Sequence, residues 1–264
     1  MTALDREYHQ TIVSSDNFIT IDDSAISLKK AISYLNATGD LPNFIQRILH
    51  RHVLEQHLQD RPDVQADPQQ VEQAVVNFRV QNRLSEPGQF EQWLKSQNLT
   101  YEVFRDRAEA SLRAEKIKQE VVSEKVQAYF NENKEQLDRV VLSRIVVLAG
   151  ALADDIRKQV EARTATFESL AKQHSVTNDS NLNGLMGAIQ LGQLPPPIRE
   201  QLRGRDPGNL VGPVEVEGRY TLLRVEQWLP AVLEGNLKRQ LDERFFTQWL
   251  QEQLQNKQIK LNID

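Results

Sequence analysis

The sequence predicts an α+β protein in which a helical part is joined to a smaller part of strands and helices. Residues 1–138 carry mainly the apolar spacing of amphipathic helices. From Val140 to about Trp228 the pattern changes to strand, helix, glycine-rich loop, helix and two strands. After Pro230 the helical spacing returns. We therefore predict three segments, 1–138, 139–229 and 230–264, with the last packing on the first.

The first segment is predicted to open with a small β-hairpin and to continue as helices. The stretch "FITIDDSAISL" alternates apolar and polar residues around Asp22 and Asp23, which is typical of two short strands and a tight turn. Helical spacing follows over Ser27–Leu35 and, after Pro42, along a broad apolar face that reaches Leu58. Further helices are predicted at residues 69–84, around Trp93, from Thr100 onward, and from Ser123 to Leu137.

The middle segment is predicted to be a mixed domain. Its apolar run "VVLSRIVV" indicates a core strand, interrupted by Ser143 and Arg144. Residues 151–163 and a shorter stretch after Thr166 have helical spacing. A glycine- and proline-rich loop at 178–198, the short helix "PIREQLRG" and a hairpin that turns at Glu217-Gly218 complete the pattern.

The last segment is predicted to be one amphipathic helix and a strand-like tail. The stretch "LEGNLKRQLDERFFTQWLQEQLQ" places apolar side chains on one side, and we expect this stripe to pack into the helical part. The alternative is that part of it lines a groove for client polypeptide. The tail "QIKLNID" alternates in polarity, so it is expected to pair with the "FITI" strand of the hairpin.

Composition argues against several classes of function. The net charge of -5 disfavours general nucleic-acid binding, because phosphate contacts need a basic face. The chain has no cysteine, which removes disulfides, thiol catalysis and Cys-ligated metal. His50, His52 and His57 share one helical stretch, but no carboxylate is placed to complete a metal site, so none is predicted.

The N-terminus and the hydropathy pattern bear on location. Residues 1–18 hold no apolar run of signal-peptide length, and no window approaches the ~20 apolar residues of a membrane span. If Met1 is the native start, a cytoplasmic location is expected.

Residues 140–228 resemble the parvulin family of peptidyl-prolyl isomerases. The phrases that carry the resemblance are "LSRIVV", "TFESLAKQHS", "NGLMGAIQLGQLPPPI" and "GNLVGPVEVEGRYTLLRVE", which match the family in order, spacing and apolar character. The resemblance implies an FKBP-like β-α3-β-α-β2 domain. The helical part with the C-terminal helix resembles, more weakly, the chaperone module of SurA, PrsA and trigger-factor foldases, and the chain looks closest to cyanobacterial members.

The resemblance implies a reaction that needs neither cofactor nor metal. Amide resonance gives the prolyl imide bond a rotation barrier of ~18–20 kcal/mol, and no bond is made or broken when it isomerises. An isomerase needs a pocket that grips the proline ring and favours the twisted amide. By family position, Met186, Ile189, Leu194 and Ile198 are expected to form that pocket. The alternative is that these four side chains are ordinary core.

The polar half of the expected site departs from the family. Arg144 takes the place of the family's first histidine, Tyr220 aligns with the second, and Thr177 falls near the family's cysteine or aspartate. These three are the candidate catalytic residues. Arg144 is expected to hydrogen-bond Tyr220 or Thr177, or to reach toward the imide or a substrate carbonyl. A hydrogen bond from Tyr220 to Thr177 would keep a polar frame in place of the paired histidines. The alternative for Arg144 is that it extends to solvent without a role.

Two functions follow from these expectations. The first is a foldase that binds unfolded or proline-containing polypeptide and isomerises X–Pro bonds, with weak activity because the histidines are replaced. The second is a holdase or targeting chaperone without catalysis, for which an exported protein is one candidate client. The sequence leaves the client, the oligomeric state and the main client site open.

Overall fold

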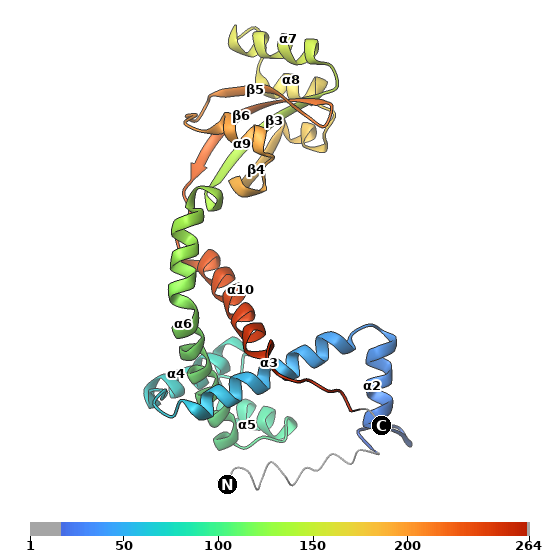
Figure 1. The fold of residues 1–264 in the computed structure, drawn as a ribbon, viewed down its shortest axis with the longest axis vertical. Helices are drawn as coiled ribbons and strands as arrows, with labels where there is room; N and C mark the ends of the chain where they lie inside the picture. Colours follow the sequence, from blue (N-terminus) through green and yellow to red (C-terminus); the bar gives the residue numbers. More distant parts are fainter. Residues whose placement is uncertain (1–16, 263–264) are drawn as a thin grey trace. The chain divides into compact units, whose positions relative to one another are not determined.

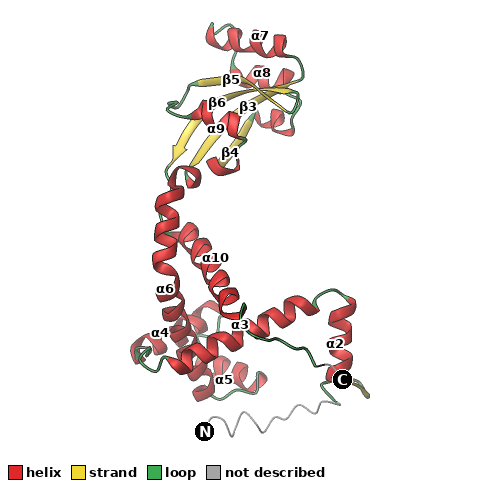
Figure 2. Ribbon diagram, in the orientation of Figure 1, coloured by secondary structure: helices red, strands yellow, loops and turns green. Residues whose placement is uncertain are grey.

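The structure, a computed structural model, describes residues 17–262 and divides into two compact units. The first unit holds the described residues up to Ser123 and those from Asp242 onward, and the second holds Glu124–Leu241. Two long helices, α6 (Tyr101–Leu137) and α10 (Gly235–Leu254), contribute residues to both units. Figure 1 labels most of the helices and strands, and Figure 2 colours them by type. The boundaries predicted for the three sequence segments, 1–138, 139–229 and 230–264, remain a prediction.

The first unit begins with the predicted hairpin and continues as helices. Strands β1 (Ile19–Ile21) and β2 (Ser24–Ile26) pair antiparallel, and Asp22 in the turn has a positive φ of 52°. Helix α2 (Leu28–Ala37) starts after Ser27, whose side chain accepts a hydrogen bond from the Lys30 amide. The remaining helices are α3 (Leu41–Asp60), α4 (Pro68–Gln81) and α5 (Pro87–Ser96), followed by the first part of α6.

Aromatic and aliphatic clusters hold the helices of this unit together. The ring of Phe78 on α4 lies 4.8 Å from that of Phe104 on α6 and 5.0 Å from that of Trp93 on α5. In a separate cluster, Trp249 and Leu250 of α10 pack with Val53 of α3. The amphipathic stripe predicted for the C-terminal helix is therefore buried, at these two positions, against a helix of the N-terminal part. Within the described residues no helix is both long and apolar enough to span a membrane.

Two predictions for this unit are wrong. Helix α6 runs through Ser123 without a break, because no proline or glycine interrupts its sequence there. The tail does not pair with the hairpin: residues 258–262 lie in no strand, and β1 and β2 form a two-stranded sheet by themselves. Ile259 in the tail and Ile19 in the hairpin are both about half exposed. The apolar side chains of the two alternating segments are therefore not buried in a core.

The second unit is built on an antiparallel sheet of four strands in the order β4-β3-β6-β5. Its elements in chain order are β3 (Arg139–Val147), α7 (Gly150–Glu161), α8 (Phe167–His174), the 3₁₀ turn η1 (Asn178–Leu182), β4 (Leu185–Gln190), the turn η2 (Leu191–Gln193), α9 (Pro196–Leu202), β5 (Leu210–Val216) and β6 (Arg219–Leu229). With η1 counted as the third helix, this is the predicted β-α3-β-α-β2 order. The predicted loop at 178–198 thus contains the edge strand β4.

The two faces of this sheet carry separate buried clusters. On one face, Leu142 and Leu223 pack with Leu194, Ile198 and Leu202 from the α9 region. On the other, Ile145 and Leu222 pack with residues of α7 and α8 such as Ile156 and Phe167. Arg224 adds a polar tie on the α8 face: its guanidinium lies over the Phe167 ring, and its hydrogen bond to Glu168 holds the pKa of that carboxyl below its ordinary value. The mixed α+β class predicted from the sequence is confirmed.

One carboxylate ties together the points where the chain enters and leaves the sheet. Asp138, between α6 and β3, accepts a hydrogen bond from the Ala231 amide after β6 at 2.7 Å and one from Lys134 at 3.1 Å. Its backbone carbonyl accepts the Leu191 amide at the end of β4. Three segments therefore meet at Asp138.

We predict that Asp138→Ala lowers the free energy of unfolding by about 1–2 kcal/mol, because the Ala231 amide loses its acceptor. Asp138→Asn is the matched control, since its amide oxygen still accepts that hydrogen bond. Urea unfolding followed by circular dichroism measures both variants. Equal losses in the two variants, or none in either, would contradict the role given to the side-chain oxygen.

Candidate functional site

Arg144 lies in β3 where the strand passes beyond its partner β4. The last pair between β3 and β4 is Ser143 with Leu185, whereas pairing with β6 continues regularly from Leu142 to Val147. Because side chains alternate along a regular strand, Arg144 shares a face with Leu142, and its partner across the ladder is Leu223. Both leucines belong to the cluster beneath α9. The arginine in the core strand therefore stands at the rim of that apolar cluster.

An aspartate in the turn η1 holds the Arg144 side chain. The Nε atom of Arg144 donates to Oδ2 of Asp179 at 2.6 Å. The Asp179 side chain is 13% exposed and that of Arg144 33%, so the pair is partly shielded from water. A charge-assisted hydrogen bond of this kind fixes the guanidinium plane and leaves its other N–H groups for a ligand. Arg144 is thus anchored, and the alternative of a freely solvated side chain is not what the structure shows.

Two hydroxyl groups extend this contact back to β3. The Thr177 hydroxyl donates to Oδ1 of Asp179, and Oγ of Ser175 lies 2.9 Å from the Thr177 hydroxyl. A hydroxyl has one hydrogen, so Thr177, which gives its own to Asp179, must accept from Ser175. Ser175 in turn accepts the Val146 amide at 3.1 Å. The hydrogen bonds therefore run in one direction, from the strand through two hydroxyls to the carboxylate that binds Arg144.

A glycine allows the turn to approach the strand closely enough for these contacts. Gly184 has a φ of +84°, and a Cβ atom there would lie 2.5 Å from the Arg144 carbonyl oxygen. Its carbonyl accepts the Arg144 amide, and its own amide donates to the Asp179 carbonyl, both at 2.8 Å. Any side chain at residue 184 would push η1 away from β3. Gly184 therefore sets the distance between Arg144 and Asp179.

The four residues expected to bind a proline ring lie in one cluster. Leu194 and Ile198 are buried at 7% exposure each, and Met186 and Ile189 of β4 are partly buried against them. This cluster is on the sheet face that also carries Arg144. The structure brings the apolar residues together, while their role in binding stays a prediction.

Tyr220 is not brought to this site. It pairs with Val147, so it lies on the opposite face from Arg144, against the cluster of Ile145 and Leu222. Its ring also packs closely on Gly150 at the start of α7. The expected link from Tyr220 to Thr177 is not found among the hydrogen bonds of the described residues, and the placement does not support a catalytic role for Tyr220.

Two residues not singled out from the sequence bear on this site: one takes part in its hydrogen bonds, and the other lies on the same face of the sheet. Asp179 lies two residues after Thr177, and its carboxylate next to a candidate hydroxyl was a signal available in the sequence. Thr221, next to Tyr220, pairs with Val146, so its side chain lies on the Arg144 face, where it is 7% exposed. A shift of one residue along a strand exchanges the two faces of a sheet. The alignment of the final hairpin could not resolve that shift without the register.

Comparisons with known proteins agree with the architecture of this domain. The Rotamase family model, described as a PPIC-type PPIase domain, matches residues 147–227. Two curated relatives are named Chaperone SurA. The one from Pseudomonas fluorescens strain Pf0-1 is 24% identical over 204 residues, 68% of this chain and 48% of the relative. The one from Pseudomonas aeruginosa is 22% identical over 256 residues, 83% of this chain and 61% of the relative.

Two solved structures are also similar. A peptidylprolyl isomerase (PrsA) from Bacillus cereus is 18% identical with a TM-score of 0.47 and 94% of each chain covered. A PpiC-type peptidyl-prolyl cis-trans isomerase domain is 24% identical with a TM-score of 0.36, covering 38% of this chain and 99% of that one. The chain spans about half the length of the Pseudomonas fluorescens relative. The resemblance predicted from the sequence is confirmed for this part of the chain: residues 147–227 match the family model of the PPIC-type, or parvulin, peptidyl-prolyl isomerase domain.

Proposed function

We propose that this protein is a foldase that binds proline-containing stretches of unfolded polypeptide and accelerates cis–trans isomerisation of their X–Pro bonds. The observation that carries the proposal is the apolar cluster of Met186, Ile189, Leu194 and Ile198, which shares a sheet face with the anchored guanidinium of Arg144. The relatives named as SurA chaperones support unfolded polypeptide as the client class.

The energetic demand on such a site is small. Uncatalysed isomerisation takes about 10–100 s at 25 °C. A ~10³-fold acceleration lowers the barrier by only about 4 kcal/mol, since each tenfold step is worth about 1.4 kcal/mol. Burial of a proline ring among aliphatic side chains and one directed hydrogen bond are effects of that size.

Arg144 has two ways to act, and they differ in their effect on rate. When the imide twists, resonance is lost and the nitrogen lone pair becomes able to accept a hydrogen bond. A donor aimed at that nitrogen stabilises the transition state alone and raises kcat. A donor to a flanking carbonyl of the substrate holds ground state and transition state equally, and lowers KM without changing kcat.

A second candidate function is a chaperone that binds clients without catalysis. The observation that favours it is the set of polar residues at the site. Arg144 and Thr177 stand where the resemblance implies histidine and cysteine or aspartate, and Tyr220 lies on the opposite face of the sheet. If client binding does not use the parvulin pocket, suppression of client aggregation survives alanine substitution of Met186 and Leu194. Loss of that suppression would place client binding in the pocket.

We predict that Arg144→Met lowers kcat/KM for a prolyl tetrapeptide about tenfold or more in a protease-coupled assay, because the anchored donor is lost. Asp179→Asn, which keeps the shape but weakens the anchor, is expected to give a smaller loss. Arg219→Met, at the exposed first residue of β6, is the matched control and keeps full activity. A rate unchanged by Arg144→Met would remove Arg144 from the mechanism.

We also predict that Met186→Ala raises KM several-fold, because ring burial is worth roughly 25 cal/mol per Å² of apolar surface. Met186 is only partly buried, so the fold should tolerate the change, and thermal unfolding of the same sample checks this. Leu148→Ala, at an exposed leucine just after β3, is the control for surface hydrophobicity. If both variants bind and turn over peptide like the parent protein, the cluster is ordinary core.

A further inference from the structure

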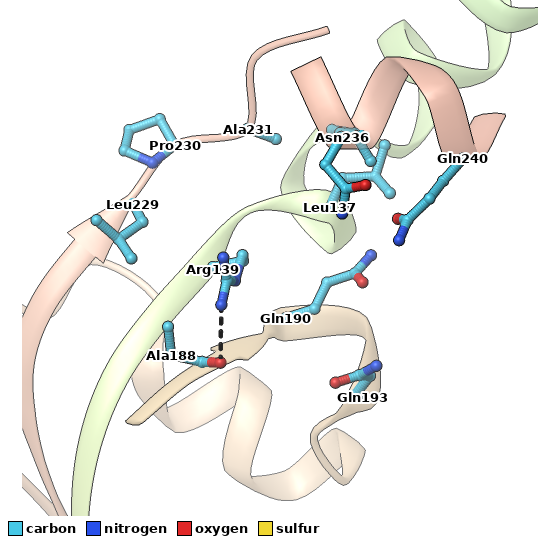
Figure 3. Close-up of a pocket in the computed structure, with 11 residues that line it drawn as sticks. Leu137, Arg139, Ala188, Gln190, Gln193, Leu229, Pro230, Ala231, Asn236 and Gln240 are labelled. Carbon is cyan, nitrogen blue, oxygen red and sulfur yellow. Dashed lines mark hydrogen bonds between the residues drawn. The ribbon is translucent and has the colours of Figure 1, made fainter. Parts of the chain in front are cut away.

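A second hollow opens at the end of the sheet where the chain enters and leaves it. Its volume is about 640 Å³, and it lies wholly within the unit Glu124–Leu241. Figure 3 shows the side chains around it. They come from the α6–β3 junction, β4, η2, the end of β6 and the start of α10: Leu137, Arg139, Ala188, Gln190, Gln193, Leu229, Pro230, Ala231, Asn236, Leu237 and Gln240.

Carboxamide side chains give this hollow its chemical character. Gln190, Gln193, Asn236 and Gln240 all line it, and in Figure 3 Gln190 and Gln240 extend from opposite sides toward each other. A carboxamide both donates and accepts hydrogen bonds, as a peptide group does. Four of them in one hollow match a ligand made of peptide groups, whatever its side chains are.

The open edge of β4 borders the same hollow. β4 is the outermost strand on its side of the sheet. The Leu191 amide donates to the carbonyl of Asp138, the residue just before β3. By the alternation of an antiparallel ladder, the backbone groups of Ile189 therefore also face β3, while those of Ala188 and Gln190 face outward. Arg139 binds the outward Ala188 carbonyl, and the other outward peptide groups of Ala188 and Gln190 are a template for one more strand.

The opposite edge of the sheet carries a proline, which β4 lacks. β5 contains Pro213, its ladder with β6 is bulged between Val211 and Val214, and the guanidinium of Arg157 on α7 caps the Gly212 carbonyl. Proline and bulges are devices that stop edge pairing. The ladder of β4 with β3 is also bulged, between Leu142 and Ser143, but β4 has neither a proline nor a lysine along Leu185–Gln190. The two edges of one sheet therefore differ in their capacity to accept a strand.

Arg139 supplies the charge of the hollow. Its guanidinium donates to the Ala188 carbonyl at 3.2 Å, drawn as the dashed line in Figure 3. Among the ion pairs of the described residues it has no carboxylate partner. An exposed arginine beside an open strand edge complements an acidic side chain on an incoming segment.

We propose that an extended segment of client polypeptide adds to β4 as a fifth strand, with an acidic side chain bound by Arg139 and its peptide groups bound by the carboxamides of the hollow. This site is separate from the expected proline pocket, because Ile189 faces the α9 cluster while Ala188 and Gln190 line the hollow. This proposal rests on the proposed foldase function and specifies the bound client as an extended segment with an acidic side chain. The bound segment needs no proline.

The test is fluorescence anisotropy with labelled, proline-free decapeptides of alternating valine and threonine that carry one central glutamate or, in the matched probe, one central lysine. The full chain is expected to bind the glutamate peptide about tenfold more tightly than the lysine peptide, and Arg139→Glu to reverse that preference. Arg219→Glu, at the other end of the sheet, is the control and leaves the preference unchanged. A glutamate peptide N-methylated at alternate residues cannot pair with a strand edge and should bind at least tenfold more weakly.

Several results would overturn the proposal. They are equal affinity for the two peptides, an effect of Arg219→Glu as large as that of Arg139→Glu, and undiminished binding of the N-methylated peptide. Sedimentation that shows a dimer lost in Arg139→Glu, with no peptide effect, would assign the edge to a second copy of this chain. Because the probes lack proline, absent isomerase activity does not alter these outcomes, and failure here leaves the isomerase proposal intact.

Discussion

The close approach of the turn η1 to strand β3 is the contact on which the candidate site depends. Gly184 permits it, because the Arg144 carbonyl occupies the space that a side chain would need. Once the turn is in place, Asp179 reaches Arg144, and the hydroxyls of Ser175 and Thr177 connect that carboxylate to the Val146 amide. A charged donor is thus held beside an apolar cluster. The arrangement is preorganised, which is what electrostatic stabilisation of a transition state requires.

The two sites proposed above lie on opposite faces of the sheet near β4. One face buries Leu142, Leu194 and Ile198 and carries Arg144, and it is the side assigned to a proline ring. The other face, at the end where α6 leads in and α10 leads out, opens into the carboxamide-lined hollow. Because side chains alternate along β4, Ile189 lies in the apolar cluster while Ala188 and Gln190 line the hollow. Asp138 stabilises this end of the sheet by joining the segments that enter and leave it.

Much of the fold was predictable because it rests on strong local signals. The hairpin turn at Glu217-Gly218, the cap at Thr166 and the apolar run of β3 each specify one local structure. The strand β4 and the apolar quartet followed from the family resemblance, since a glycine-rich stretch hides strand periodicity. The polar site was only partly predictable. Arg144 and Thr177 do meet, but through Asp179, and the face of Tyr220 depends on a register that sequence spacing leaves undetermined.

The most direct test of the central claim is NMR exchange spectroscopy on a prolyl tetrapeptide, with the isotope-labelled protein at a tenth of the peptide concentration. If the protein is an isomerase of this kind, we expect cis–trans exchange of the peptide far faster than the uncatalysed interconversion, which takes about 10–100 s. We also expect shift changes confined to the cluster of Met186, Ile189, Leu194 and Ile198 and to Arg144. Uncatalysed exchange even with excess protein, and shift changes that leave those five residues untouched, would contradict it.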